Sequence, residues 1–206
     1  MRSTAPVPAR PARVVSGVDQ VDRVLGGGAV AGSVVMISGR RGSGKSTLVG
    51  QWCSGAADAG PVLIASGEEA EERIRQRLHR TESTHPELFV SESDSWEEIQ
   101  TQAERLGAVA VVVDSVQTLA IGDRRAGSPS ALADVSKQVP QWARQSGAVV
   151  WLIAQETVAG EPAGGTRLPH AVDVELTFDG AHLESVKNRH GQLERARLRM
   201  TANGLV

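Results

Sequence analysis

The sequence of 206 residues is poor in cysteine, in aromatic residues and in long apolar runs. Cys53 is its only cysteine, which excludes an intramolecular disulfide and a zinc site built from several cysteines. A lone thiol is typical of a reducing compartment, so we expect a cytoplasmic protein that binds no zinc. The longest apolar stretches, 108–113 and 148–154, are far shorter than the about 20 residues that a membrane helix needs, so no membrane association is expected.

Aromatic residues and lysines are both scarce. Aromatic residues make up 3% of the chain, and no two tryptophans form a basic aromatic platform, so we expect them to pack helices and sheet rather than to stack on bases. The four tryptophans are Trp52, Trp96, Trp142 and Trp151. Only three of the 22 basic residues are lysines, and two of them, Lys45 and Lys187, lie in the motifs described below. Since lysine and arginine are not interchangeable at a phosphate, these two lysines are a modest indication of phosphate chemistry.

Charge is balanced overall and uneven along the chain. The 22 basic and 24 acidic residues give a net charge of −2, and a composition of 40% hydrophobic residues excludes a disordered chain. Residues 66–98 contain ten acids and four arginines, whereas residues 185–199 contain five basic residues and one acid. This asymmetry permits an acidic polymer as partner, although solvated faces of helices and strands explain it equally well.

The hydrophobic pattern alternates between short β-rich runs and helical stretches, which predicts an α/β domain with a mostly parallel sheet. Three alternating segments near the end of the chain are expected to add antiparallel strands to one side of the sheet. The expected strands are 33–38, 61–65, 88–91, 108–113, 149–154, 174–178, 182–188 and 195–201, and the expected helices end near residues 57, 80, 106 and 144.

Two regions are expected from the composition. Residues 1–13 carry three arginines and three prolines with no apolar run after them, so they are expected to form a flexible basic arm rather than a secretory signal. Residues 14–206 are expected to form one domain, since no linker or internal repeat divides them.

A glycine-rich motif between the first predicted strand and helix is the strongest chemical signal. Residues 39–46 fit the pattern G-x-x-x-x-G-K-[ST], in which backbone N–H groups surround phosphate oxygens at a helix N-terminus. In this pattern Lys45 reaches the terminal phosphates and Ser46 binds Mg²⁺, so ATP and Mg²⁺ are the expected ligands. The expected nucleotide contacts are Gly39, Arg40, Arg41, Gly42, Ser43, Gly44, Lys45, Ser46 and Thr47.

Three acids follow predicted strands where this chemistry needs carboxylates. Asp114 ends a buried apolar run and is the expected second group at the Mg²⁺. Glu68 and Glu69 follow the strand 61–65 through a tight turn, which predicts that one of them activates the attacking water. The alternative for both is a role in the first turn of a helix, where acids are favoured anyway.

Five motifs occur together in an order that resembles RecA-type ATPases. They are SGVDQVDRVLGGG at 16–28, the phosphate loop, SGEE at 66–69, VDSVQTL at 113–119 and KNRHG at 187–191. The set is most similar to the ATPase core of the RadA/Sms DNA repair proteins and covers the chain from about residue 14. Helicases of the DnaB type share this core. The 206 residues contain neither the four-cysteine zinc module nor the Lon-protease-like domain of a typical RadA protein.

The resemblance implies a RecA-like P-loop NTPase core with Glu68 as the catalytic carboxylate. It also implies that Lys187 and Arg189 are cationic fingers inserted into a neighbouring subunit's nucleotide site, hence a homo-oligomeric ring or filament. Gln155 resembles the glutamine that reports the γ-phosphate to a DNA-binding loop. The alternative for Lys187 and Arg189 is a pair of solvent-facing edge charges.

Two loops after the central strands, 120–128 and 156–169, correspond to the DNA-binding loops of the RecA class. Arg124, Arg125 and Arg167 are the expected phosphate contacts, with ordinary surface arginines as the alternative. The resulting interpretation is a DNA-dependent ATPase that acts on single-stranded DNA in repair or recombination. A KaiC-like signalling ATPase with protein partners and a DnaB-type helicase core stay open as alternatives.

Overall fold

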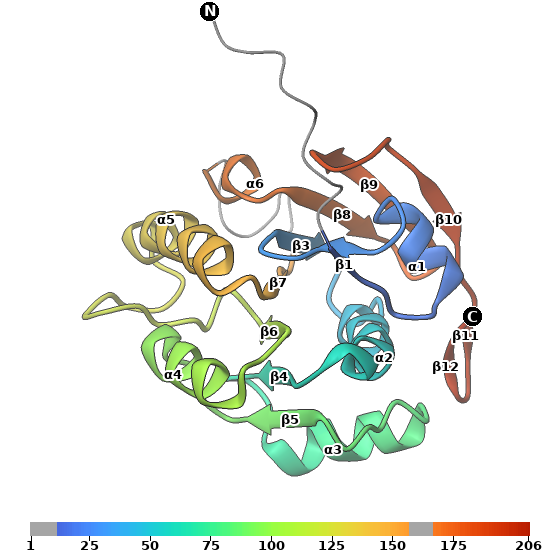
Figure 1. Ribbon diagram of the computed structural model, residues 1–206, viewed down its shortest axis with the longest axis horizontal. Coiled ribbons are helices and arrows are strands. Elements are labelled where there is room, and N and C mark those ends of the chain that lie inside the picture. The colour runs from blue at the N-terminus through green and yellow to red at the C-terminus, as the bar shows by residue number, and fades with distance from the viewer. Residues whose placement is uncertain (1–11, 157–166) are drawn as a thin grey trace, which may run out of the picture.

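A sheet of eight strands forms the centre of the computed structural model, which describes residues 12–156 and 167–206 (Figure 1). The strand order is β10-β9-β8-β3-β7-β6-β4-β5. The six strands from β8 to β5 run parallel to one another, and β9 and β10 are antiparallel additions. The strands are β3 Val34–Ser38, β4 Val62–Ala65, β5 Leu88–Ser91, β6 Ala110–Asp114, β7 Val149–Ile153, β8 Val174–Phe178, β9 His182–Asn188 and β10 Arg195–Arg197.

Helices cover both faces of this sheet, because the central strands are apolar on both sides. On β3, Val35 and Ile37 pack in one core with side chains from α1, α2 and α3, whereas Val34 and Met36 pack in a second core with side chains from α4, α5 and α6. No helix in the described part of the chain is long and apolar enough to cross a membrane. The helices are α1 Asp19–Val24, α2 Lys45–Ala56, α3 Glu71–Arg80, α4 Trp96–Leu106, α5 Pro129–Ser146 and α6 Arg167–Ala171, with a 3₁₀ turn at Ala57–Ala59.

The four tryptophans pack between helices and sheet, as the sequence predicts. The ring of Trp52 on α2 lies 5.1 Å from that of Trp151 on β7, and the ring of Trp96 on α4 lies 5.5 Å from that of Trp142 on α5. All four are buried. Cys53 is buried as well, and desolvation raises the pKa of its thiol, which leaves it an unreactive core residue.

The prediction of a mostly parallel sheet with antiparallel strands on its C-terminal side is confirmed, with two corrections. Strand β8 pairs in parallel with β3 and is antiparallel only to β9. The reason is that β8 follows α6, which returns the chain to the end of the sheet at which β3 begins. The predicted strand 195–201 is two strands in different sheets: β10 pairs with β9, and β11 Met200–Thr201 pairs with β12 Gly204–Leu205.

Arg13 belongs to the folded domain rather than to the predicted arm 1–13, whose residues up to 11 lie outside the described residues. It lies in β1 Arg13–Val14, which pairs with β2 Ala29–Val30. Its guanidinium donates to the carbonyl oxygens of Gly28 at 2.6 Å and His190 at 2.8 Å. Arg13 therefore ties the glycine-rich turn after α1 to the loop that follows β9.

Candidate active site

The phosphate-loop motif connects the carboxyl end of β3 to the N-terminus of α2. Gly44 precedes α2 with a φ of 96°, a conformation that favours glycine. At Gly39 an added Cβ would lie 2.1 Å from the carbonyl oxygen of Phe178, so only glycine fits there. The first turn of α2 contains no acid and no capping side chain. Its N–H groups and helix dipole are therefore available to an anion, as the motif predicts.

Lys45 is the buried cation of this loop. The residue is 5% exposed, and its ammonium donates to the carbonyl oxygens of Gly39 at 2.7 Å and Arg40 at 2.9 Å. Desolvation lowers the pKa of Lys45, and the charges of Asp114, Glu156 and Glu68 act in the opposite direction. The lysine is thus held beneath the loop among carboxylates.

Ser46 and Asp114 meet across the site. The Ser46 side chain hydrogen-bonds the carboxylate of Asp114, which ends β6. Burial raises the pKa of Asp114, while the Ser46 hydrogen bond and the charge of Arg77 act against this rise. A hydroxyl and one carboxylate beside a phosphate site fit Mg²⁺, which takes its other ligands from water and phosphate oxygens. Residues 12–156 and 167–206 contain no cluster of three or more His, Cys, Asp and Glu side chains that could hold a metal by themselves.

Glu68 lies at the carboxyl ends of three neighbouring strands. It follows β4 and accepts a hydrogen bond of 2.6 Å from the Ser115 hydroxyl, just after β6. The Gln155 amide, just after β7, lies 3.4 Å from each Glu68 carboxylate oxygen. The Ser66 hydroxyl accepts from the backbone N–H of Glu68 at 3.2 Å and so forms the tight turn predicted here. Glu68, Lys45 and Gln155 line one cavity.

Glu69 has different surroundings from Glu68. It forms an ion pair with Arg77 on α3, and the other terminal nitrogen of Arg77 lies 3.8 Å from an Asp114 carboxylate oxygen. Arg77 and Arg73 both line the cavity, and the sequence motifs predict neither. Their spacing of four residues on a helix that directly follows Glu69 is the signal that could have identified them.

The residues of the phosphate loop line two separate depressions. Arg41, Gly42, Gly44 and Thr47 line the cavity together with Lys45 and Ser46. Arg40 lines a separate depression with Glu156 and Asp179, and its backbone carbonyl accepts a hydrogen bond from the Lys45 ammonium. The Ser43 hydroxyl is buried and has no hydrogen-bond partner among the described residues.

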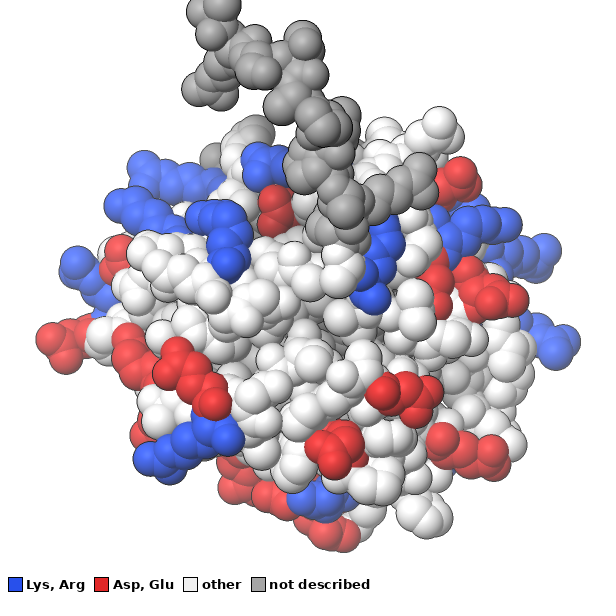
Figure 2. Space-filling model, in the orientation of Figure 1, with Lys and Arg blue, Asp and Glu red and all other residues white. Residues whose placement is uncertain are grey.

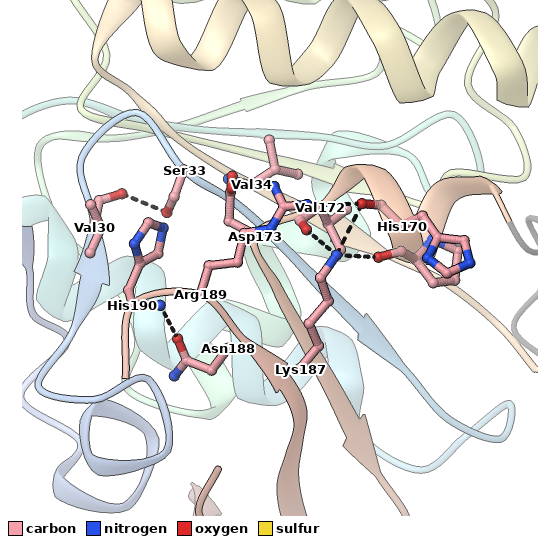
Figure 3. Close-up of polar contacts among 11 residues, drawn as sticks. Val30, Ser33, Val34, His170, Val172, Asp173, Lys187, Asn188, Arg189 and His190 are labelled. Carbon is pink, nitrogen blue, oxygen red and sulfur yellow. Dashed lines mark hydrogen bonds and ion pairs between the residues drawn. The ribbon is translucent and has the colours of Figure 1, made fainter. Parts of the chain in front are cut away.

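Lys187 and Arg189 lie near the amino ends of the parallel strands, whereas the cavity lies at their carboxyl ends. Figure 3 shows the two cations beside His170, Val172 and Asp173. The Lys187 ammonium donates to the Val172 carbonyl, and Asp173, which pairs with Arg189, accepts from the Val34 N–H at the start of β3. The phosphate loop follows the other end of β3, about 13 Å along the strand. Neither cation therefore reaches the phosphate loop of its own chain.

Lys187 is not the solvent-facing edge charge that the alternative assumed. Although β10 pairs only with residues 182–184 of β9, the Lys187 ammonium donates to the carbonyl oxygens of Pro169, His170 and Val172 at 2.7–3.0 Å. Desolvation lowers the pKa of Lys187, and the nearby charge of Arg189 lowers it further. Arg189, just beyond β9, pairs with Asp173 at 3.3 Å and is about half exposed.

The arginines predicted to contact DNA are exposed and lie on two different elements. Arg124 and Arg125 are in the loop between β6 and α5, where Arg124 pairs with Asp134 at 3.4 Å, and Arg167 begins α6. Most of the second predicted loop, 157–166, lies outside the described residues. Most basic side chains on the face shown in Figure 2 gather in the half that carries α5, α6, β9 and β10. Most acids lie in the half that carries α3, α4 and β5.

The sheet order, the loop between β3 and α2 and the carboxylates at the strand ends define a P-loop NTPase core of the RecA type. A family model described as an AAA domain matches residues 4–161, more than half of the chain, and the chain belongs to this family.

Curated relatives give the closer comparison. The chain is 34% identical over 203 residues to the DNA repair protein RadA of Streptococcus pyogenes serotype M3, covering 94% of this chain and 45% of that protein. The DNA repair proteins RadA of Pseudomonas aeruginosa and Aquifex aeolicus are 35% and 34% identical, with 45% and 46% of their lengths covered. The chain therefore resembles the ATPase core of RadA, as its motifs predict, and spans a little under half the length of these relatives.

Replacing Asp114 by asparagine is expected to stabilise the nucleotide-free protein. The pKa of this acid is raised in the folded state, so its ionisation costs stability as pH rises through the interval between its ordinary pKa and the raised one. Asparagine is neutral and still accepts the hydrogen bond from Ser46. The melting temperature at pH 7 should therefore rise in Asp114→Asn, and the gain should shrink as pH falls toward the ordinary pKa of about 3.9.

Asp134→Asn is the matched control. It removes an acid from an exposed ion pair with Arg124, so its melting temperature should stay close to that of the unmodified protein. A lower melting temperature of Asp114→Asn at pH 7 would contradict the expected cost of the buried charge.

Proposed function

We propose that this chain is the ATP-hydrolysing core of a DNA-dependent ATPase of the RadA type, which acts on single-stranded DNA as a homo-oligomer. The observation that carries the proposal is the position of Glu68. Its carboxylate is held between Ser115 and Gln155 in the cavity that also contains Lys45. A carboxylate fixed there is suited to orient and deprotonate the water that attacks the terminal phosphate.

The remaining groups of the cavity have complementary roles in this proposal. Lys45 and the N-terminus of α2 bind the phosphates. Ser46 and Asp114 hold Mg²⁺, which when bound neutralises charge on the phosphate oxygens. Gln155 contacts Glu68 and directly precedes the connection to α6, so it links the catalytic carboxylate to a predicted DNA-binding segment.

A second copy of the chain completes the site. Lys187 and Arg189 lie near the amino ends of the parallel strands, away from the cavity at the carboxyl ends. They can therefore serve a phosphate cavity only in a neighbouring subunit. A cation supplied in this way stabilises transition-state charge only when the neighbour is docked. The excess of acids at 66–98 and of basic residues at 185–199 supports head-to-tail assembly of identical subunits.

The proposed DNA contacts are the exposed Arg124, Arg125 and Arg167. RadA relatives are named as DNA repair proteins, which supports a nucleic-acid partner. Contacts of arginines with phosphates predict binding to single strands that weakens as salt concentration rises. Binding that is absent even at low salt would favour the alternative of a signalling ATPase with protein partners.

Steady-state ATP hydrolysis with and without single-stranded DNA tests the proposal. DNA should stimulate turnover, and Lys187→Ala should remove this stimulation, because the segment that carries Lys187 and Arg189 would no longer complete the phosphate cavity of the neighbouring subunit. Lys45→Ala serves as the blank, and Lys137→Ala, which removes an exposed lysine of α5, should be stimulated like the unmodified protein. Hydrolysis that ignores DNA and survives Lys187→Ala would overturn both the DNA dependence and the role in trans.

A further inference from the structure

Asp173 makes the contact that fixes the direction of Arg189 (Figure 3). One of its carboxylate oxygens lies 3.3 Å from Nη1 of Arg189, and its backbone carbonyl accepts from the Arg189 N–H at 3.0 Å. A second nitrogen of the guanidinium donates to the carbonyl oxygen of His170 at 3.3 Å. Two anchors on one side of the guanidinium set the plane in which it lies.

Asp173 is itself held firmly by the start of β3. Its second carboxylate oxygen accepts from the Val34 N–H at 3.0 Å, and its own N–H donates to the Val34 carbonyl at 2.9 Å. The Asp173 side chain is 14% exposed, whereas that of Arg189 is 53% exposed. A nearly buried carboxylate on the central sheet thus holds a cation that projects toward solvent.

Lys187 fixes the same segment from the other side. An ammonium has three N–H donors, and the carbonyl oxygens of Pro169, His170 and Val172 take all three. A guanidinium has five donors, so Arg189 keeps several for another ligand after binding Asp173 and His170. Lys187 therefore holds the end of α6, and Arg189 is the group free to bind an anion in bidentate fashion.

We infer that Asp173 is a positioning residue that orients Arg189 toward the phosphate cavity of the neighbouring subunit, with Lys187 anchoring the segment that carries Asp173. The inference rests on the proposed function, because it needs a nucleotide site shared between two copies. It assigns the direct contact to Arg189 and supporting roles to Asp173 and Lys187. Asp173 acts only in the subunit that donates the arginine.

Mixing two inactive variants tests the shared site first. Arg189→Ala subunits keep an intact cavity and lack the finger, whereas Lys45→Ala subunits keep the finger and lack a working cavity. Hydrolysis of ATP with single-stranded DNA should appear on mixing, because each Arg189→Ala cavity can then receive Arg189 from a Lys45→Ala neighbour. No recovery on mixing would overturn the proposed trans site, whatever Asp173 does.

Adding Asp173→Asn to one partner at a time tests the inference itself. In the Lys45→Ala donor it should lower the recovered turnover about tenfold, the scale on which outer-shell partners tune a site. In the Arg189→Ala acceptor it should change nothing, because that subunit has no arginine to orient. A merely structural residue would lower recovery in both partners. The control Glu184→Gln removes an acid 3.9 Å from Arg195 on the same hairpin and should leave the donor fully active.

The variant is chosen to preserve folding. Asparagine keeps an oxygen that can accept from the Val34 N–H, and melting temperature and oligomer size show whether the donor is intact. If Asp173→Asn is unstable, Asp173→Glu provides the second measurement, since it keeps the charge and displaces the guanidinium, and the same loss in the donor is expected. Full recovery with either folded donor variant would overturn the inference while leaving the trans site in place.

Discussion

Glu68→Gln should lower the turnover number for ATP hydrolysis by about 10²- to 10⁴-fold, the contribution typical of a positioned general base. Glutamine has nearly the shape of glutamate, so it keeps an oxygen for the Ser115 hydroxyl, yet it cannot take a proton from water. ATP affinity should stay near the unmodified value, because the proposed phosphate contacts, Lys45 and the N-terminus of α2, are unchanged in this variant. Single-turnover kinetics with a separate measurement of nucleotide binding distinguishes these two effects.

Glu69→Gln is the matched control, since it makes the same chemical change at the adjacent residue. Glu69 is paired with Arg77, so its replacement should disturb this pair and the nearby Asp114 but leave the Glu68 carboxylate in place. Turnover should therefore fall much less than in Glu68→Gln. Equal losses in the two variants would show that the ion pair, and not the isolated carboxylate, supports the chemistry.

The motifs along the chain predict the catalytic end of this fold well, for a simple physical reason. Parallel strands all end at the same edge of the sheet, so any polar residue that follows a central apolar run comes to that edge. Glu68, Asp114 and Gln155 each follow such a run, and the structure brings them to the phosphate loop. The meeting of these three residues can be predicted from the order of the strands along the chain and from the rule that a crossover connection joins parallel strands.

Contacts that depend on side-chain direction were not predictable in the same way. Arg40 and Arg41 are adjacent in the loop, yet only Arg41 lines the phosphate cavity. Arg77 comes within 3.8 Å of Asp114 on a helix, α3, that packs against α2 and β5, an arrangement that no local pattern specifies. The three carbonyl partners of Lys187 come from the end of α6, a five-residue helix that the hydrophobic period does not show.

The carboxyl ends and the amino ends of the parallel strands thus differ in how their charged groups are arranged. At the carboxyl ends, Glu68 and Asp114 surround the buried Lys45. At the amino ends, Asp173 and carbonyl oxygens hold Lys187 and Arg189. In the proposed head-to-tail assembly, the amino ends of the strands of one subunit face the cavity of the next subunit. In that proposal the same chain supplies both the acidic cavity and the cation that completes it, without placing both in one subunit.

Lys45→Ala should abolish measurable hydrolysis, with a loss of at least about 100-fold, the cost typical of removing one preorganised group that stabilises developing charge. The ammonium is the buried cation of the cavity and is close enough to three carboxylates for their charges to affect its pKa. Without it, Asp114, Glu68 and Glu156 face a phosphate with less compensating charge, so nucleotide affinity should fall together with turnover.

Lys137→Ala serves as the control for Lys45→Ala, because it removes an exposed lysine from α5 and leaves the cavity unchanged. Equilibrium binding of ATP and steady-state hydrolysis should both be normal in this variant and both be lost in Lys45→Ala. A Lys45→Ala protein that hydrolyses ATP at an undiminished rate would contradict the assignment of the cavity between β3 and α2. A Lys45→Ala protein that binds ATP normally but does not hydrolyse it would limit the lysine to the transition state, where the terminal phosphate carries its greatest charge.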